Sequence, residues 1–159
     1  MRITRPSKKK RQLAIGTAVL LLGTTMLTGC GTEAVKMVTD QNGLKSEVVL
    51  IADGDRLVEQ YTSNTIDFKQ MGVSADAMKN EIYKYQQKAS DAAGVEYRYA
   101  VGDDKALEYT EVKFADADIA KLKELNVVQG ELTGEETPED VSLQKTIDAL
   151  TQIGFTKEQ

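Results

Sequence analysis

Two runs rich in β-branched residues, separated by an Asn-Gly pair, constrain the fold of this chain more than any other feature. The runs are residues 35–39 (VKMVT) and 45–52 (KSEVVLIA), and the Asn-Gly pair lies at 42–43. Because an Asn-Gly pair favours the positive φ angles of a tight hairpin turn, this pattern predicts two antiparallel strands. A second turn at 53–55 (DGD) leads into 56–68 (RLVEQYTSNTIDF). The sequence therefore predicts an antiparallel meander of three consecutive strands.

The next segment predicts a helix and two more strands. Ser74 is a good N-cap, and apolar residues recur behind it at spacings of four and three until Gly94. This apolar stripe consists of Met78, Ile82, Tyr85, Ala89 and Ala92. Residues 95–101 (VEYRYAV) alternate between apolar and polar side chains, as a half-buried strand does. Residues 106–114 (ALEYTEVKF) predict the last strand, and because its apolar phase changes, we expect a bulge near 110–111.

The C-terminal segment predicts two helices. Apolar spacing predicts a short helix over 116–125, and 137–140 (TPED) has the proline and acidic residues of a helix start. The last helix has an apolar stripe of Leu143, Ile147, Leu150 and Ile153. Strands that come in runs, with helices interspersed singly, are typical of the α+β class. We therefore expect one α+β domain, with an antiparallel sheet of about five strands packed against two main helices, plus the short helix.

The N-terminal segment has the pattern of an export signal. The first twelve residues carry six basic side chains and no acidic one, and an apolar stretch follows at 13–27. As a helix, this stretch spans about 22 Å, which is less than the ~30 Å hydrocarbon core of a bilayer. The combination predicts a signal peptide that is removed from the mature protein. The alternative is a single membrane span that the mature protein retains.

The apolar stretch ends in Leu27-Thr28-Gly29-Cys30, which contains the only cysteine of the chain. It resembles the lipobox of bacterial lipoproteins, in which a branched apolar residue and two small residues precede the cysteine. The resemblance implies that a diacylglyceryl group is attached to the Cys30 sulfur and that the lipoprotein signal peptidase cleaves between Gly29 and Cys30. The alternative is a free thiol at an ordinary secretory cleavage site.

These boundaries predict where the protein lies. Residues 1–29 are expected to be removed, 30–34 to form a short lipidated tether, and 35–159 to form a single domain. A tether of about five residues reaches ~17 Å when extended, which keeps the domain close to the bilayer. Two acyl chains hold a protein on a bilayer where one chain is marginal. We therefore expect a lipid-anchored protein on the extracytoplasmic face of the bacterial cell membrane.

Removal of the basic leader makes the mature chain strongly acidic. Residues 30–159 hold 14 basic and 25 acidic side chains, a net charge of −11. This charge disfavours nucleic acid and anionic lipid headgroups as partners. A lipidated Cys30 also leaves no cysteine for a disulfide, so the domain depends on its core for stability.

The composition leaves few catalytic or metal sites open. With no histidine and no free cysteine, the chain excludes the Ser-His-Asp and Cys-His triads and the usual zinc sites. We expect no cofactor and no metal, although carboxylate sites for Ca²⁺ have to be considered. Four acidic pairs offer oxygen atoms that suit Ca²⁺, but none has the spacing of an EF-hand loop, and roles in turns or helix caps explain them more simply. The pairs are Asp53 and Asp55, Asp103 and Asp104, Asp116 and Asp118, and Glu135 and Glu136.

Two further kinds of site stay open. A carboxylate pair brought together from distant strands could serve a hydrolase, although nothing distinguishes two of the 25 acidic residues. An aromatic sheet face could bind a small ligand or peptide, but packing of the sheet against the first helix through Tyr85 is the simpler role for the tyrosines. The six tyrosines are Tyr61, Tyr83, Tyr85, Tyr97, Tyr99 and Tyr109.

Residues 46–72 (SEVVLIADGDRLVEQYTSNTIDFKQMG) and 142–157 (SLQKTIDALTQIGFTK) resemble the YehR-like family of small bacterial lipoproteins. The resemblance extends in order and spacing over nearly all of the mature chain. It implies an α+β domain behind a lipobox, with no assigned biochemical function. It implies no functional residue beyond Cys30 as the lipidation site.

Together these patterns predict a non-enzymatic accessory or ligand-binding lipoprotein of the bacterial cell envelope. Its partners are expected to be the lipid bilayer, through the diacylglyceryl group on Cys30, and an envelope protein or a small ligand. Two alternatives remain: an envelope hydrolase that uses a carboxylate pair, and an acidic sensor that binds cations or cationic peptides.

Overall fold

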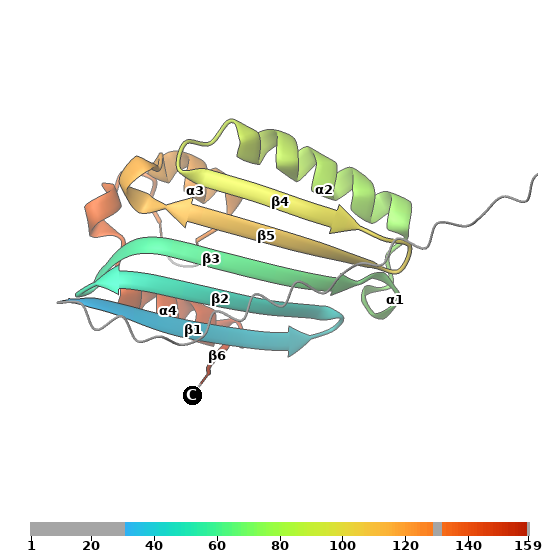
Figure 1. Ribbon diagram of the computed structural model, residues 1–159, viewed down its shortest axis with the longest axis horizontal. Coiled ribbons are helices and arrows are strands. Elements are labelled where there is room, and N and C mark those ends of the chain that lie inside the picture. The colour runs from blue at the N-terminus through green and yellow to red at the C-terminus, as the bar shows by residue number, and fades with distance from the viewer. Residues whose placement is uncertain (1–30, 129–131, 159) are drawn as a thin grey trace, which may run out of the picture.

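The computed structural model describes residues 31–128 and 132–158, which form a six-stranded antiparallel sheet with helices on one face (Figure 1). The strands are β1 (Thr32–Gln41), β2 (Leu44–Asp53), β3 (Arg56–Asp67), β4 (Val95–Val101), β5 (Lys105–Lys113) and β6 (Thr156–Lys157). The helices are α1 (Phe68–Met71), α2 (Ala75–Ser90), α3 (Ile119–Leu125) and α4 (Leu143–Gln152), with 3₁₀ turns η1 (Phe114–Asp116) and η2 (Pro138–Asp140). The strand order is β4-β5-β3-β2-β1-β6, and the predicted α+β class is confirmed.

The predicted meander forms as expected. Asn42 and Gly43 have φ angles of 51° and 86°, and the strands on either side of them pair from Gln41 with Leu44 onward. The second turn contains Gly54 at a φ of 63°, and β3 pairs with β2 on one side and with β5 on the other. This topology places β3 and β2 in the middle of the sheet.

Two short elements were not expected from the sequence. The single turn α1 follows β3, where Asp67 caps it by accepting a hydrogen bond of 3.0 Å from the backbone N–H of Gln70. The strand β6 has two residues and pairs with Met37 and Val38 of β1. Because each element is so short, tertiary packing rather than a local sequence pattern determines it.

The core lies between the sheet and its helices. Alternate positions of β1 and β2 face the helices, so Val35, Met37 and Leu50 are each at most 1% exposed. They belong to one apolar cluster with residues of α3 and α4, including Leu122 and Leu150. A second cluster lies beneath α2, and its buried members are Ile66, Phe68, Ile82 and Ala106.

The bulge expected near residues 110–111 is wrong. The pairing of β5 with β3 and with β4 runs without a shift along the strand. The change of apolar phase has another cause: Val112 faces the core, while Leu107 lies on the opposite face and is 43% exposed. The shift in register occurs between β2 and β3 instead, at Ile51 and Ala52.

The expected start of the last helix at 137–140 is also corrected. These residues make only the turn η2, closed by a capping box between Thr137 and Asp140. The helix α4 begins later, at Leu143, with Ser142 as its N-cap. The intervening Val141 is extended, and its carbonyl accepts a hydrogen bond of 2.9 Å from the N–H of Leu57.

The apolar stripe of α4 differs at its C-terminal end. Leu143 and Leu150 are buried and Ile147 packs against the core, as predicted. Ile153 is instead 54% exposed, and Thr146 occupies a buried position on the helix. The stripe therefore ends one turn before the sequence pattern does.

Candidate functional site

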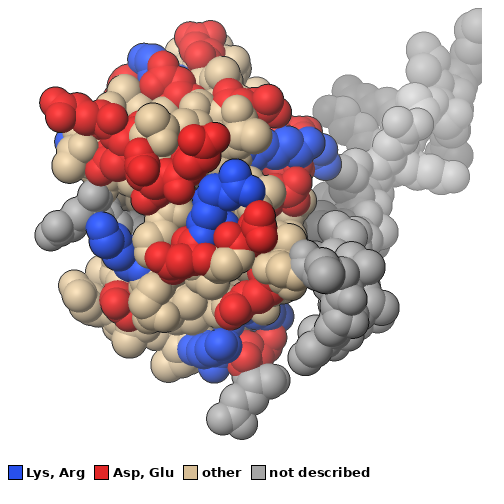
Figure 2. Space-filling model, turned by 90° about the vertical axis from the view of Figure 1, so that its left-hand side faces the viewer, with Lys and Arg blue, Asp and Glu red and all other residues tan. Residues whose placement is uncertain are grey.

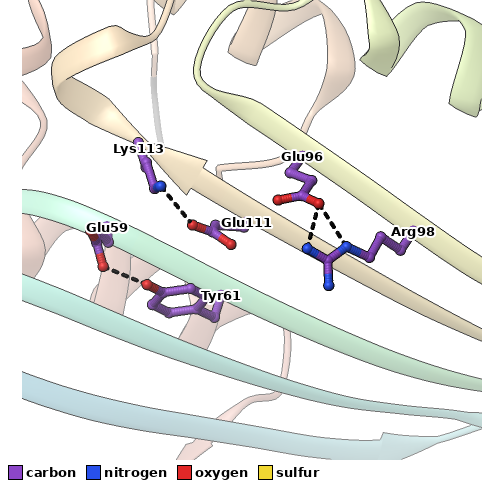
Figure 3. A network of polar contacts seen from close by, with 6 residues as sticks. All are labelled: Glu59, Tyr61, Glu96, Arg98, Glu111 and Lys113. Carbon is purple, nitrogen blue, oxygen red and sulfur yellow. Dashed lines mark hydrogen bonds and ion pairs between the residues drawn. The ribbon is translucent and has the colours of Figure 1, made fainter.

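The sheet has two different faces, and each offers a candidate surface. The helices cover one face and leave a groove between α2 and α4. The other face is open, and Figure 3 shows a network of polar side chains from β3, β4 and β5 on it. The network consists of Glu59, Tyr61, Glu96, Arg98, Glu111 and Lys113.

Two ion pairs and one tyrosine hydrogen bond hold the carboxylates of Glu59, Glu96 and Glu111 on the open face. Arg98 binds Glu96, with 2.7 Å between Nε and Oε1, and Lys113 binds Glu111 at 3.3 Å. The hydroxyl of Tyr61 donates a hydrogen bond of 2.5 Å to Glu59. This hydrogen bond, followed by burial, raises the pKa of Tyr61 above its ordinary value.

The chemistry of this network is that of a fixed polar surface. Hydrogen bonds to Glu96 and Glu111 raise the pKa values of Arg98 and Lys113, respectively. The guanidinium of Arg98 also lies 5.8 Å from the ring centre of Tyr109, in cation–π range.

The groove on the other face has a volume of about 220 Å³. Figure 1 shows α2 along the β4 edge of the sheet and α4 behind β1 and β2, so the two helices lie over opposite parts of the sheet. The sheet side of the groove is lined by polar and apolar residues of β2, β3 and β5, namely Leu44, Ser46, Val48, Gln60, Thr62, Asn64 and Thr110. Its other lining residues come from the helices and adjoining segments, namely Tyr85, Asn126, Val127, Leu150, Ile153 and Phe155.

The polar part of this lining is unusual because it lies on the middle of the sheet. Ser46, Gln60 and Thr110 are 3%, 2% and 7% exposed, although they occupy positions where a core would normally place apolar side chains. The hydroxyl of Ser46 donates a hydrogen bond of 2.7 Å to Asn64 Oδ1. Buried polar side chains need such partners, and most of this lining has them.

A polar row continues from the groove towards the β4 edge. Asn64 Nδ2 lies 3.4 Å from Glu108 Oε2, and the other oxygen of Glu108 accepts a hydrogen bond from the hydroxyl of Tyr97. Burial, then this hydrogen bond, raises the pKa of Tyr97 far above 10. Tyr97 packs edge to face on Tyr85 of α2, with 4.8 Å between ring centres. Burial, followed by the charge of Glu108, raises the pKa of Tyr85 to about 12.

The tyrosines do not share one face. Tyr85, Tyr97 and Tyr99 make successive ring contacts on the helix side, which confirms the predicted packing through Tyr85. Tyr61 and Tyr109 lie on the open face, with ring centres 6.4 Å apart. Tyr83 of α2 is 56% exposed.

Residues of several acidic pairs cap helices or accept hydrogen bonds from backbone N–H groups in turns, as the sequence indicated. Asp118 caps α3, and Asp55 binds the start of α4. Glu136 accepts hydrogen bonds from the backbone N–H groups of Thr133 and Gly134, and the Thr133 bond contributes most to lowering its pKa to about 2. Within residues 31–128 and 132–158, no group of three or more acidic, histidine or cysteine side chains is placed to bind a metal ion.

The predicted lipidation site lies outside the described residues. The structure does not describe residues 1–30, which include Leu27, Thr28, Gly29 and Cys30. The lipobox and the lipidation of Cys30 therefore remain predictions from the sequence. Over the part of the chain that the structure describes, no helix is long and apolar enough to cross a membrane.

The groove was missed by sequence reasoning, although a signal was present. Gln60, Thr62 and Asn64 alternate along β3 and face the helices, between the buried apolar residues Leu57 and Ile66. Polar side chains at every second position of a strand normally indicate a solvent-exposed face. The pattern indicates a polar groove only once these positions of β3 are known to face the helices.

A six-stranded antiparallel sheet with helices on one face and a polar-lined groove between them defines a two-layer α+β domain. The family model for proteins of unknown function called DUF1307 matches residues 33–156, and the chain belongs to this family.

Two solved structures have the same fold. The NMR structure of the Escherichia coli YehR protein is similar over 79% of this chain and 89% of that chain, with 18% identity and a TM-score of 0.64. The NMR structure of a Streptococcus pneumoniae protein is similar over 99% of this chain and all of that chain, with 14% identity and a TM-score of 0.51. No curated protein sequence matches the chain. The resemblance to the YehR-like family is thereby confirmed, and both relatives are bacterial.

Proposed function

We propose that this protein is a lipid-anchored, non-enzymatic binding protein on the extracytoplasmic face of the bacterial cell membrane. The observation that carries the proposal is the position of the domain relative to the lipobox cysteine. The strand β1 begins at Thr32, two residues after Cys30 and within the segment expected to be a tether. The carbonyl of Gly31 also accepts a hydrogen bond of 3.3 Å from the N–H of Gly54 in the β2–β3 turn.

Such an anchor would hold one end of the sheet next to the bilayer. This is the end with the β2–β3 turn, and Figure 2 views the molecule from it. Asp and Glu side chains gather over the upper half of this end (Figure 2). An acidic surface is repelled by anionic lipid headgroups, so electrostatic attraction would not hold the domain on a membrane. A covalent lipid on Cys30 supplies the attachment that this surface lacks.

The binding role is supported by the groove, which combines a polar lining with apolar walls of α4. Small-molecule sites are typically concave and largely apolar, with a few placed polar groups. A hydrolase with two carboxylates is less favoured, because Glu59, Glu96 and Glu111 on the open face are each held by a neighbouring side chain.

The anchor is tested by labelling the full chain with a palmitate analogue in a bacterial host. Wild type should incorporate the label and lose residues 1–29. Cys30→Ser should do neither, because the thioether cannot form on a hydroxyl. Thr25→Ser, outside the four-residue motif, serves as the matched control and should behave as wild type. Labelling of Cys30→Ser, or its cleavage after Gly29, would overturn the proposed anchor.

The non-enzymatic role has its own test. The purified protein, incubated with cell-wall glycans and peptides, should release no product. Turnover that is lost on a single Glu→Gln change at Glu59, Glu96 or Glu111 would instead establish the carboxylate hydrolase.

A further inference from the structure

We propose that the groove between α2 and α4 binds a primary alkylammonium ion, and that the carboxylate of Glu108, at the α2 side of the groove, pairs with the ammonium group. This inference deepens the proposed binding role and rests on it, but it is independent of the lipid anchor. Its basis is one carboxylate on β5 that lies beside the groove and makes no ion pair with a described residue.

The carboxylate of Glu108 is turned towards the groove on one side. Glu108 faces the helices, as do the alternate residues Ala106 and Thr110 of the same strand. Its Oε1 accepts a hydrogen bond from the hydroxyl of Tyr97 on β4, whereas its Oε2 lies 3.4 Å from Nδ2 of Asn64 on β3. Because Asn64 lines the groove, Oε2 is the oxygen that a bound molecule can meet.

This oxygen can accept a further hydrogen bond. Glu108 is half-buried, so the side chain is not enclosed by the fold. The contact of 3.4 Å with Asn64 is long for a hydrogen bond, and a carboxylate oxygen has two lone pairs. A donor in the groove can therefore bind Oε2 without displacing the hydrogen bond from Tyr97.

The charge of Glu108 indicates the charge of the ligand. On the open face, Glu96 and Glu111 are paired with Arg98 and Lys113, but no Lys or Arg lines the groove beside Glu108. A carboxylate that is partly withdrawn from water without a counter-charge raises the free energy of the fold, and a bound cation lowers it. The groove therefore favours a cation over a neutral or anionic molecule.

Tyrosine rings flank the carboxylate and add to this preference. Tyr99 lies directly opposite Glu108 on β4, Tyr97 stacks on Tyr99 with 5.9 Å between ring centres, and Tyr85 packs edge to face on Tyr97. The faces of such rings attract cations. Burial, and then the charge of Glu108, raises the pKa of Tyr85 to about 12, which is consistent with a phenol close to the carboxylate.

The hydrogen-bonding groups favour a primary ammonium ion over a quaternary one. The hydroxyl of Tyr85 makes no hydrogen bond with a described residue, and Tyr85 lines the groove. Its oxygen and Oε2 of Glu108 are both acceptors. An ammonium group with N–H bonds can donate to both, whereas a quaternary ammonium group has no N–H to donate.

The size and the far wall of the groove define the rest of the ligand. A volume of about 220 Å³ corresponds to about seven water molecules, or a chain of about six or seven non-hydrogen atoms. The wall on the α4 side is apolar, with Leu150 and Phe155 buried and Ile153 exposed at the end of the helix. An ammonium group at Glu108 would direct an alkyl chain of about five carbons towards this wall.

The probe for this site is pentylammonium, titrated into the ¹⁵N-labelled full chain in phosphatidylcholine nanodiscs. Its matched control is 1-pentanol, which has the same chain and no charge. We expect saturable shifts of the Asn64 side-chain amide with a Kd of about 1 mM, and a Kd at least about tenfold higher for 1-pentanol. Absence of saturable shifts up to about 10 mM, or equal binding of 1-pentanol, would overturn the proposal. Tighter binding of N-acetyl-lysinamide than of pentylammonium would also overturn it, by assigning the site to a lysine side chain of a peptide.

Two variants, each with a matched control, locate the site. Glu108→Gln should weaken binding of pentylammonium about tenfold or more, because it removes the charge and keeps an oxygen for Tyr97. Glu111→Gln, on the opposite face of the same strand, should bind within about twofold of wild type. Ile153→Lys places a positive charge at the groove and should weaken binding about threefold or more. Leu107→Lys, on the open face, is its control and should bind within about twofold of wild type.

The contrary results are equally specific. Wild-type affinity in Glu108→Gln would remove Glu108 from recognition, and an equal loss in Glu111→Gln would show only a general attraction to an acidic protein. Wild-type affinity in Ile153→Lys, or an equal loss in Leu107→Lys, would place the binding elsewhere. Failure here leaves the labelling of Cys30 unchanged, while failure of the anchor leaves these shifts unchanged, so the two proposals are separable.

Discussion

The hydroxyl of Ser142 donates a hydrogen bond of 2.7 Å to Oδ2 of Asp55, across 87 residues of sequence. The other carboxylate oxygen of Asp55 accepts a hydrogen bond of 2.8 Å from the backbone N–H of Gln144, and its carbonyl accepts one from Leu143 at 2.7 Å. One aspartate in the β2–β3 turn thus satisfies the N–H groups of Leu143 and Gln144, and the N-cap Ser142 accepts from the N–H of Lys145. It joins the N-terminal meander to the last helix.

This arrangement predicts an acid-sensitive contribution to stability. The hydrogen bonds from Ser142 and then Gln144 lower the pKa of Asp55. A carboxyl whose pKa is lower in the folded chain stabilises the fold above its unfolded pKa, near 3.9, and loses that contribution as the pH falls through the folded value. Asp55→Asn should therefore be less stable than wild type at pH 7, and the difference should shrink below about pH 4.

Urea unfolding at pH 7 and pH 3 measures this difference. Asp103→Asn, in the β4–β5 turn, is the matched control and should change stability by less than about 0.5 kcal/mol at neutral pH. A destabilisation of Asp55→Asn that is the same at both pH values would show that the charge of Asp55 does not contribute.

The corrected packing of α4 predicts two different outcomes for two apolar residues on that helix and at its end. Leu150 is 1% exposed within the main core, whereas Ile153 is 54% exposed. Leu150→Ala should lower the free energy of unfolding by about 2–5 kcal/mol, because it leaves a cavity. Ile153→Ala should lower it by less than about 0.5 kcal/mol. Equal losses in the free energy of unfolding, measured with denaturant, would mean that Ile153 is buried as deeply as Leu150.

The hairpin turn predicts a similar contrast between two glycines. Both Gly43 and Gly54 have positive φ angles, which cost an alanine about 1–2 kcal/mol. A Cβ on Gly43 would also lie 2.7 Å from Gln70 Cβ and 3.0 Å from the carbonyl of Asp67, whereas a Cβ on Gly54 would meet nothing within 4 Å. Gly43→Ala should therefore cost about 1–3 kcal/mol more than Gly54→Ala. The same melting temperature for the two variants would refute the close approach of α1 to Gly43.

The polar row predicts different effects for two tyrosine hydroxyls on β4. Tyr97 donates to the carboxylate of Glu108, while Tyr99 donates to Gln86 at 3.0 Å and is 40% exposed. Tyr97→Phe should lower the free energy of unfolding by about 1.5–3 kcal/mol, because it removes a hydrogen bond to a charged group. Tyr99→Phe should lower it by about 0.5 kcal/mol. Chemical denaturation of both variants at neutral pH measures the two losses. A larger loss for Tyr99→Phe than for Tyr97→Phe would contradict the hydrogen bond between Tyr97 and Glu108.

Local signals in the sequence predicted most of the fold. The Asn-Gly pair at 42–43 requires positive φ angles, Ser74 caps α2 with its side chain, and 95–101 alternates as a strand. Each of these features depends on neighbouring residues, so a sequence pattern can show it. The phase change in β5 was misread because both faces of that strand carry apolar side chains, with Val112 in the core and Leu107 on the open face.

The groove depends on tertiary arrangement and could not be predicted in the same way. Gln60 lines the groove from a middle strand of the sheet. Its side-chain amide donates a hydrogen bond to the carbonyl of Val127, which is 67 residues away in the sequence. Neither fact can be seen from the sequence around position 60. The lipobox is the opposite case, since its four residues are contiguous and a sequence pattern alone predicts their role.

The intact mass of the protein purified from bacterial membranes tests the proposed anchor most directly. The proposal predicts a chain that begins at Cys30 and carries a diacylglyceryl group on that residue. A chain that retains residues 1–29, or one that begins at Cys30 without lipid, would contradict it.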